Sequence, residues 1–249
     1  MLVRTEGIVL RSIPYKETTR LATLYTRELG KLTLIAHGAQ SIKSRFGATL
    51  QLLSHVQALI YTRPTRSIQI LSDCAHVRIY KEIGSDLKKL AVGQRICEFV
   101  LSLTEEGQNS PGIFDLLVRV LNALNNPDVD AVLLKLYFQL QLMALLGFAP
   151  AFSRESVKEI DDSGGYLLLE DGTITSKAKE DLSTLFASRG VLRAFAILHR
   201  ADFNVILHLK LTADQRRELH TLVTNFMRYH VPDTYPVRGQ KVIDQLLRS

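Results

Sequence analysis

The spacing of apolar residues changes once along this chain of 249 residues, close to Tyr80. Before Tyr80, apolar residues recur about every second position, which is typical of strands that turn alternate side chains towards a core. After Tyr80 they recur about every 3.6 positions, which is typical of helices with one buried face. We therefore predict an α+β protein with a strand-rich domain over residues 1–81 and an α-helical domain over residues 82–249.

The first domain contains five segments with the composition of strands, each bounded by turn residues. They cover residues 7–13, 21–25, 31–36, 50–61 and 67–80. Pro14 and Gly30 separate the first three segments, and Pro64 presets the backbone for a turn between the last two. Five strands with one longer connection, residues 38–47, favour an OB-type five-stranded β-barrel, which can hold a strand of nucleic acid on one face. An SH3-like barrel is the alternative.

The second domain carries signals for the ends of helices. The expected helices cover residues 85–103, 110–125, 128–146 and 212–230, with a last short one from residue 236. Ser85 and Ser110 are the expected N-caps of the first two, and Pro111 suits the first turn of the second. Gly147 can close the third helix, which is apolar on all sides, and residues 212–215 form a capping box. We expect the third helix to form the centre of the helical core.

The motifs of several common enzyme classes are absent, namely GxSxG, GxxxxGKS/T, GxGxxG and HExxH. Residues 161–165 resemble the start of a calcium loop, but Tyr166 and Gly172 stand where that loop requires Gly and Glu. Cys74 and His76 alternate within an expected strand and have no second pair of ligands for zinc. We therefore expect neither an enzyme nor a bound metal or other cofactor.

Basic residues are concentrated in the first domain. Residues 1–80 contain 11 Lys and Arg against four Asp and Glu, a net charge of +7, whereas the remaining 169 residues hold 20 basic and 21 acidic residues. No Asp or Glu occurs in the 44 residues from Leu29 to Ser72. Because Lys and Arg neutralise phosphates and release counterions, this segment favours binding of nucleic acid. The candidate DNA-binding residues are Arg11, Lys16, Arg20, Arg27, Lys31, Lys43, Arg45, Phe46, Arg63 and Arg66.

Three aromatic residues lie among these basic ones, and an aromatic ring beside a cation can stack on a base. They are Tyr15, Phe46 and Tyr61. For Tyr61, within an expected strand, we favour a place in the barrel core. Phe46 lies in the expected loop between Arg45 and Gly47, so both a stacking role and a core role remain open for it.

Several features favour a cytoplasmic, nucleoid-associated protein. Residue Glu6 comes before any apolar run, which argues against a signal peptide. The most apolar stretch, residues 131–152, is interrupted by Lys135, Gln139 and Gln141, so we expect a buried helix and no contact with a membrane. Two cysteines without a CxxC spacing suit a reducing compartment.

Short motifs along the chain resemble the RecO family. In the first domain they are residues 6–11, 15–18, 20–21, 26–31, 38–39 and 43–46, and in the second they are residues 145–150, Leu-Leu-Gly-Phe-Ala-Pro. Their order and spacing also agree with that family. The resemblance implies an N-terminal OB domain, a helical domain, and a role in DNA repair without catalysis.

The resemblance also implies particular partners. RecO proteins bind single- and double-stranded DNA and anneal complementary strands. They act with RecR to load RecA onto single strands coated by the single-strand-binding protein SSB. We expect the helical domain to recognise the acidic tail of SSB, with candidate residues Lys88, Lys89, Arg95, Arg216 and Arg217. An RNA-binding OB-fold protein and a protein-interaction scaffold are the alternatives.

Two departures from the family change these expectations. Many members carry a four-cysteine zinc finger after the Gly-Phe-Ala-Pro element, but the matching residues 152–178 contain no cysteine. We therefore expect a finger-like hairpin that lacks zinc ligands and packs around Tyr166 and residues 167–169. The loop after Gly38 is often more basic in relatives, whereas Gln40 and Ile42 stand here, which predicts a lower affinity for DNA.

Overall fold

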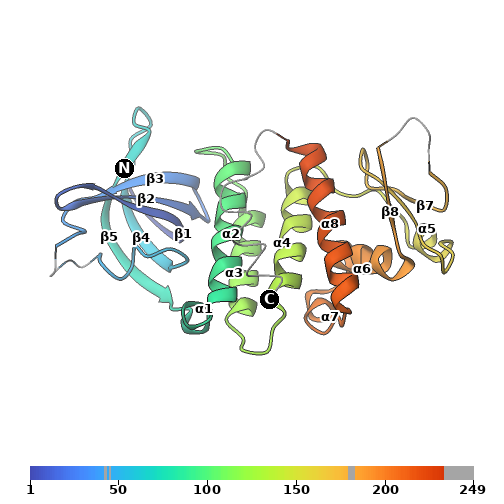
Figure 1. Ribbon diagram of the computed structural model, residues 1–249. Helices are drawn as coiled ribbons and strands as arrows, with labels where there is room; N and C mark the ends of the chain where they lie inside the picture. The colour runs from blue at the N-terminus through green and yellow to red at the C-terminus, as the bar shows by residue number, and fades with distance from the viewer. Residues whose placement is uncertain (42–43, 45, 179–182, 233–249) are drawn as a thin grey trace. The chain divides into compact units, whose positions relative to one another are not determined.

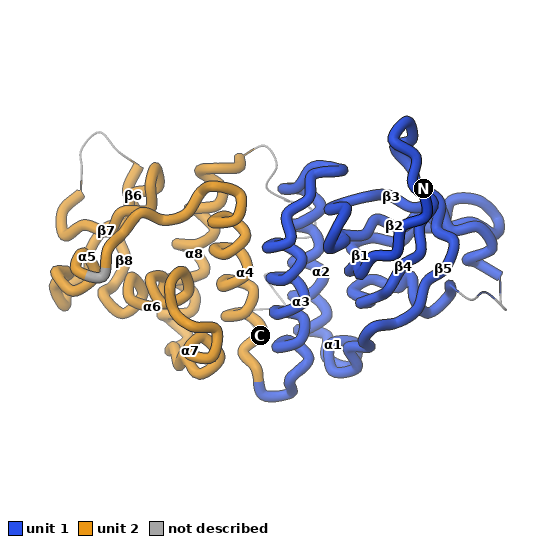
Figure 2. The backbone as a smooth tube through the Cα atoms, turned by 180° about the vertical axis from the view of Figure 1, so that it is seen from behind, with its two compact units in different colours: residues 1–128, 236–249 blue, residues 129–235 orange. Residues whose placement is uncertain are grey.

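The computed structural model describes residues 1–41, 44, 46–178 and 183–232 (Figure 1). Lys43, Arg45 and the helix expected from residue 236 lie outside the described residues. The described chain divides into two compact units, shown in blue and orange in Figure 2. Residues 1–128 belong to the first unit, and the described residues from Val129 onward form the second.

The first unit begins with a closed barrel of five strands. The strands are β1 (Leu2–Lys16), β2 (Thr19–Thr26), β3 (Gly30–Ala36), β4 (His55–Tyr61) and β5 (Ile68–Arg78). Their order around the barrel is β1-β2-β3-β5-β4, and β3 and β5 are parallel while the other neighbours are antiparallel. This arrangement confirms the predicted OB-type barrel.

Two strand ends differ from the prediction. Strand β1 continues through Pro14, which is tolerated because the register shifts between Pro14 and Lys16 and interrupts the ladder there. Strand β4 begins at His55, not at Leu50. Leu50 is buried like a strand residue, but its amide donates to the carbonyl of Phe46 within a series of turns that closes the barrel end.

Three helices follow in the same unit, α1 (Lys81–Ser85), α2 (Leu87–Leu103) and α3 (Pro111–Leu124). The prediction that Ser85 caps α2 is wrong. The cap is Asp86, whose carboxylate accepts a hydrogen bond from the amide of Lys89 at 3.0 Å, while Ser85 ends the short helix α1. Pro111 occupies the first turn of α3 as predicted, but the Ser110 hydroxyl makes no capping hydrogen bond.

The second unit contains α4 (Ala131–Leu145), α5 (Arg154–Lys158), α6 (Arg189–Arg200), α7 (Phe203–Leu207) and α8 (Ala213–His230). Helix α4 is buried on all sides, as predicted, and Gly147 follows it with a φ of +96°. The capping box is confirmed, with hydrogen bonds of 3.0 and 3.2 Å between Thr212 and Gln215. Helix α6 was not among the expected helices.

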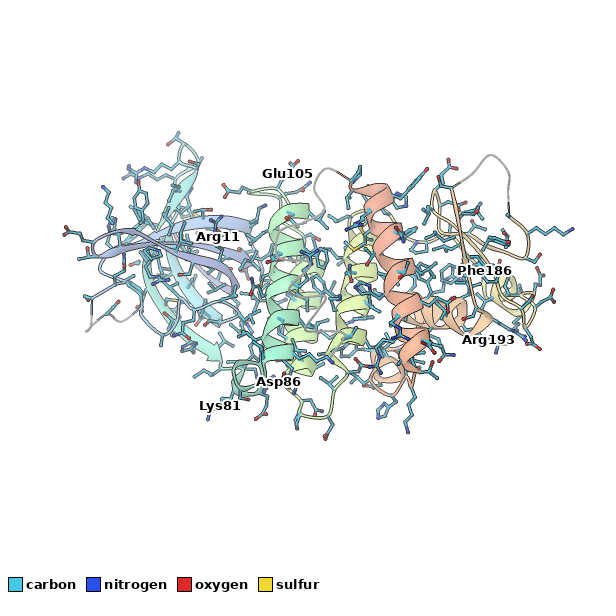
Figure 3. All side chains as sticks on the ribbon, viewed as in Figure 1. Arg11, Lys81, Asp86, Glu105, Phe186 and Arg193 are labelled. Carbon is cyan, nitrogen blue, oxygen red and sulfur yellow. The ribbon has the colours of Figure 1, made fainter. Side chains whose placement is uncertain are left out.

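A small sheet is formed by the part of the chain that follows α5 and precedes α6. Its strands β6 (Gly165–Leu168), β7 (Ile174–Thr175) and β8 (Thr184–Ala187) are ordered β7-β6-β8. Leu167 and Leu168 are buried, while the cross-strand pair of Tyr166 and Phe186 lies on the more exposed face (Phe186 is labelled in Figure 3). Of the helices that the structure describes, none is long and apolar enough to cross a membrane.

Candidate nucleic-acid interface

The outer wall of the barrel between β2 and β3 is built from cross-strand pairs. Alternate residues of each strand face the core, and the residues between them face outward. The outward pairs are Tyr25–Lys31, Thr23–Thr33 and Leu21–Ile35. These three rows divide the wall into a covered part and an open part.

The row of Tyr25 and Lys31 is covered by the chain around α2 and α3. The Tyr25 hydroxyl donates to the carbonyl of Ser110 at 3.3 Å. The Lys31 ammonium donates to the carbonyl of Leu101 at 2.8 Å and to that of Thr104. Burial lowers the pKa of Lys31, although two nearby glutamates partly oppose this effect. Lys31 was expected to contact DNA, but its ammonium is used to anchor the end of α2.

The row of Thr23 and Thr33 is half-buried and continues onto the neighbouring strands, and the Thr33 hydroxyl donates to the carboxylate of Glu106 at 2.8 Å. The two hydroxyl oxygens lie 3.3 Å apart. Arg11 of β1 is the partner of Thr23, and Ile68 of β5 is the partner of Thr33. Arg11 is exposed on the barrel (Figure 3) and forms no ion pair with any described residue. This polar row therefore ends in a cation that is free to meet a phosphate.

An apolar row runs beside the polar one. It consists of Ile13, Leu21, Ile35, Ile70 and Tyr61, one from each of the five strands. Tyr61 is 51% exposed, so our prediction that its ring fills the core is wrong. The inward position is taken by its neighbour Ile60, which is fully buried. The apolar row offers a surface on which a base can lie.

The turn between β1 and β2 supplies a basic edge to this wall. Lys16 lies over the ring of Tyr15, with the ammonium 5.7 Å from the ring centroid, and Tyr15 is 53% exposed. Arg20 donates to the hydroxyl of Ser12 at 3.0 Å and is partly buried. Gln40 donates its amide to the carbonyl of Thr19 at 2.7 Å, which ties the loop after β3 to this turn.

The loop between β4 and β5 supplies a second basic edge. Arg63 and Arg66 are both exposed there. The side chain of Gln69 holds the loop, because it accepts the amide of Arg63 at 2.8 Å and donates to the carbonyls of both arginines. The loop backbone is therefore fixed, while the two guanidinium groups face solvent.

Two candidate DNA contacts have other roles. Phe46 is only 4% exposed and belongs to the barrel core, because the turns after it fold across the barrel end. Arg27 forms an ion pair with Asp115 at 2.8 Å and stacks over the ring of Phe114, with its guanidinium carbon 4.5 Å from the centroid. We therefore remove Phe46 and Arg27 from the candidate interface.

The candidates on the helices also need correction. Lys89 is 5% exposed and donates to the carbonyls of Asn126 and Pro127, while Arg95 is 2% exposed and pairs with Glu98 at 3.0 Å. Both side chains stabilise α2 and cannot serve as surface cations. The candidates that reach the surface are Lys88 in the first unit and, in the second, Arg216 and Arg217, paired with Asp130 and Asp214 respectively.

The buried cysteines do not offer a reactive site. Burial raises the pKa of Cys74 to about 11, and it also raises the pKa of Cys97. Both effects disfavour the thiolate form that metal binding and nucleophilic attack require. In the part of the chain that the structure describes, no group of three His, Cys, Asp or Glu residues is placed to hold a metal ion.

Several residues of the interface were missed by the reasoning from sequence. Thr23 and Thr33 carry no charge, so the search for cations passed over them, although strand alternation gives their outward direction. Tyr61 was assigned to the core because the sequence does not show which residues of β4 and β5 pair with each other. The register depends on pairing across the sheet, which a single sequence does not contain.

Comparison with known proteins agrees with these features. The family models described as "Recombination protein O N terminal" and "Recombination protein O C terminal" match residues 1–80 and 84–238. The chain is 41% identical to the DNA repair protein RecO of Salinibacter ruber over 245 residues, which is 98% of this chain and 94% of the relative. It is 25% identical to the DNA repair protein RecO of Chloroherpeton thalassium over 258 residues, 99% of this chain and 100% of the relative.

A closed OB barrel with a basic rim, followed by a helical region, places the chain among OB-fold proteins. The matches to both family models extend over most of its length. The chain belongs to the RecO family of DNA repair proteins.

Proposed function

We propose that this chain is a non-catalytic recombination mediator that binds single- and double-stranded DNA on the open wall of its barrel. The observation that carries the proposal is the polar row of Arg11, Thr23 and Thr33, which lies between two basic edges. Phosphates would meet Arg11 and the cations of the edges, while bases would lie on the apolar row and on the exposed rings of Tyr15 and Tyr61.

Annealing follows from the same charges. Two complementary strands repel each other through their phosphates, and a protein cation beside each strand lowers that repulsion. Five described cations of the wall have side chains that reach the surface or its margin, namely Arg11, Lys16, Arg20, Arg63 and Arg66. If all five meet phosphates of a single strand, the logarithm of the affinity falls with the logarithm of the salt concentration with a slope of about −3.5.

Fluorescence anisotropy with a labelled single strand tests this proposal over a series of salt concentrations. Arg11→Glu and the double change Arg63→Glu with Arg66→Glu are expected to weaken binding and to make the salt slope shallower by about 0.7 for each phosphate that the variant no longer binds. The matched control is Arg193→Glu on α6, an exposed arginine of the second unit (Figure 3), which makes the same change in net charge as Arg11→Glu. Equally weakened binding in the control, or a slope near zero for the unchanged protein, contradicts the proposal.

The same assay separates the alternative functions. Competition between DNA and RNA of matched sequence identifies an RNA-binding protein if RNA displaces DNA at lower concentration, because only RNA offers 2′-hydroxyls. Absence of binding to either, together with retention by acidic peptides, identifies a protein-interaction scaffold. The proposed mediator binds the DNA strands in this assay. Because it binds DNA, we also expect it to be associated with the nucleoid in the cytoplasm.

We further propose that the helices serve protein partners, namely RecR and the acidic tail of SSB, and that RecA is loaded indirectly through them. The family membership supports this assignment, and Lys88, Arg216 and Arg217 are the surface cations that fit an acidic tail. Titration of a labelled tail peptide against the full chain tests it, with Lys88→Glu and Arg217→Glu as variants. If both variants bind the tail peptide as tightly as the parent, the tail does not bind at these cations.

Residues 152–178 are, in our proposal, the family finger without its zinc. The packing of Leu167 and Leu168 supports it, as does the hydrogen bond from the amide of Ala151 to the carbonyl of Asp171 at 2.7 Å. Gly172 lies so close to Pro150 that a β-carbon on it would come within 2.6 Å of the proline ring. These contacts replace the tetrahedral thiolate cluster as the means of closing the hairpin.

A further inference from the structure

An acidic segment lies against the proposed DNA-binding wall. The connection between α2 and α3 carries Glu105 and Glu106, both exposed. The hydroxyl of Thr33 donates to the carboxylate of Glu106 at 2.8 Å, and the amide of Gly107 donates to the carbonyl of Lys31 at 3.0 Å. The connection thus continues the sheet beside β3 for one bridge and brings a carboxylate to the polar row.

The position of this segment is fixed by close packing. Lys31 holds the end of α2 through the carbonyls of Leu101 and Thr104. Gly30 has a φ of +65°, and a β-carbon there would overlap the carbonyl oxygen of Gln108. The backbone of the connection therefore rests directly on β3, and no larger residue fits between them.

The charges of the segment oppose DNA at one end of the wall. Across the polar row, Arg11 stands beside Thr23, Thr23 lies 3.3 Å from Thr33, and Thr33 is bonded to Glu106. Glu105 and Glu106 together outweigh the single positive charge of Lys31 beneath them. A phosphate that passes Thr33 on this side meets net negative charge, whereas one near Arg11 meets a cation.

We propose that Glu105 and Glu106 form an acidic boundary of the DNA-binding wall, which lowers the affinity for a strand and confines it to the side of the apolar row and the turn of Lys16 and Arg20. This inference rests on the proposed function and adds a determinant of where the strand ends. The 44 residues from Leu29 to Ser72, which include β3 and β4, contain no Asp or Glu, so the carboxylate beside Thr33 comes from the connection between α2 and α3.

The test is the double variant Glu105→Gln with Glu106→Gln in the full chain. Glutamine keeps the size of the side chain and an oxygen that accepts the Thr33 hydrogen bond, so only the charge is removed. The single variant Glu105→Gln has Glu82→Gln as its matched control, because each removes one exposed carboxylate of the same unit, and Glu82 lies beside Lys81 at the opposite end of α2 from Glu105 (Figure 3). Binding of a labelled oligothymidylate is measured by anisotropy at low and high salt.

We expect the double variant to bind about four- to ninefold more tightly at low salt, which is about two- to threefold for each carboxylate, and we expect this difference to shrink at high salt through screening. If the double variant melts early, Glu105→Gln alone carries the test. If the double variant and the parent bind DNA with equal affinity, and the affinity of the parent still falls with salt, the acidic boundary is overturned and the proposed function stays intact. Equal tightening by Glu82→Gln and Glu105→Gln also overturns the boundary, and a parent that binds no DNA overturns both the boundary and the proposed function.

Discussion

Replacement of Lys31 by methionine separates a structural lysine from a DNA contact. The ammonium of Lys31 donates two hydrogen bonds to carbonyls at the end of α2. A hydrogen bond from a charged group contributes about 1.5–3 kcal/mol, and a cation at a helix C-terminus adds up to about 1 kcal/mol. Methionine retains the apolar stem and removes the cost of burying the charge, which offsets part of this loss.

We therefore expect Lys31→Met to lower the free energy of unfolding by about 2 kcal/mol, which corresponds to a fall in Tm of about 4–8 °C for a chain of this size. Urea denaturation followed by circular dichroism measures the first quantity. Anisotropy with a single strand at about 15 °C, well below the unfolding transition expected of an ordinary domain, measures the affinity, which we expect to change less than about twofold.

Arg11→Met is the companion variant, because Arg11 is exposed and unpaired among the described residues. It is expected to keep the stability of the parent and to lose affinity for DNA. The reasoning is refuted if Lys31→Met keeps full stability and loses as much DNA affinity as Arg11→Met. That result would place the ammonium of Lys31 on phosphate and not on the end of α2.

Three further outcomes are expected. Tyr61→Ala should weaken binding of a single strand by about 1–3 kcal/mol in anisotropy without loss of Tm, whereas Phe46→Ala should lower the unfolding free energy by about 3–5 kcal/mol in urea; the opposite pattern contradicts the assignment of the two rings. Chelation with EDTA should leave the Tm unchanged, because residues 152–178 contain no cysteine; a large fall reveals a metal that we do not expect. Stability should fall as the pH drops below about 6.5, because burial lowers the pKa of His55 and His199 and the unfolded chain then binds more protons; His55→Gln should flatten the Tm profile, and an unchanged slope contradicts this cause.

The barrel could be predicted from the sequence because its strands alternate regularly and its turns contain Pro and Gly. The outward direction of Lys31 also follows from this alternation. What covers Lys31 does not, because Leu101 and Thr104 are distant from it in the chain and reach it only through the fold. Phe46 is a similar case, since a loop residue enters the core only after the loop has folded across the barrel.

The helical part was harder to predict at its boundaries. Ser85 and Asp86 are both good capping residues, and the short helix α1 decides between them by using Ser85 as its last residue. Helix α6 was missed although Val191, Phe195 and Leu198 repeat along one face. Gly190 in its first turn lowers the helix propensity and obscures the start.

The central claim is that a DNA strand lies on the open wall of the barrel, and photo-crosslinking tests it most directly. A single strand that contains iododeoxyuridine is irradiated with the full chain, and the linked peptides are identified by mass spectrometry. We expect links to Tyr61 and Tyr15, the exposed rings of the barrel. Links only to Tyr166 or Phe186 of the second unit would contradict the claim.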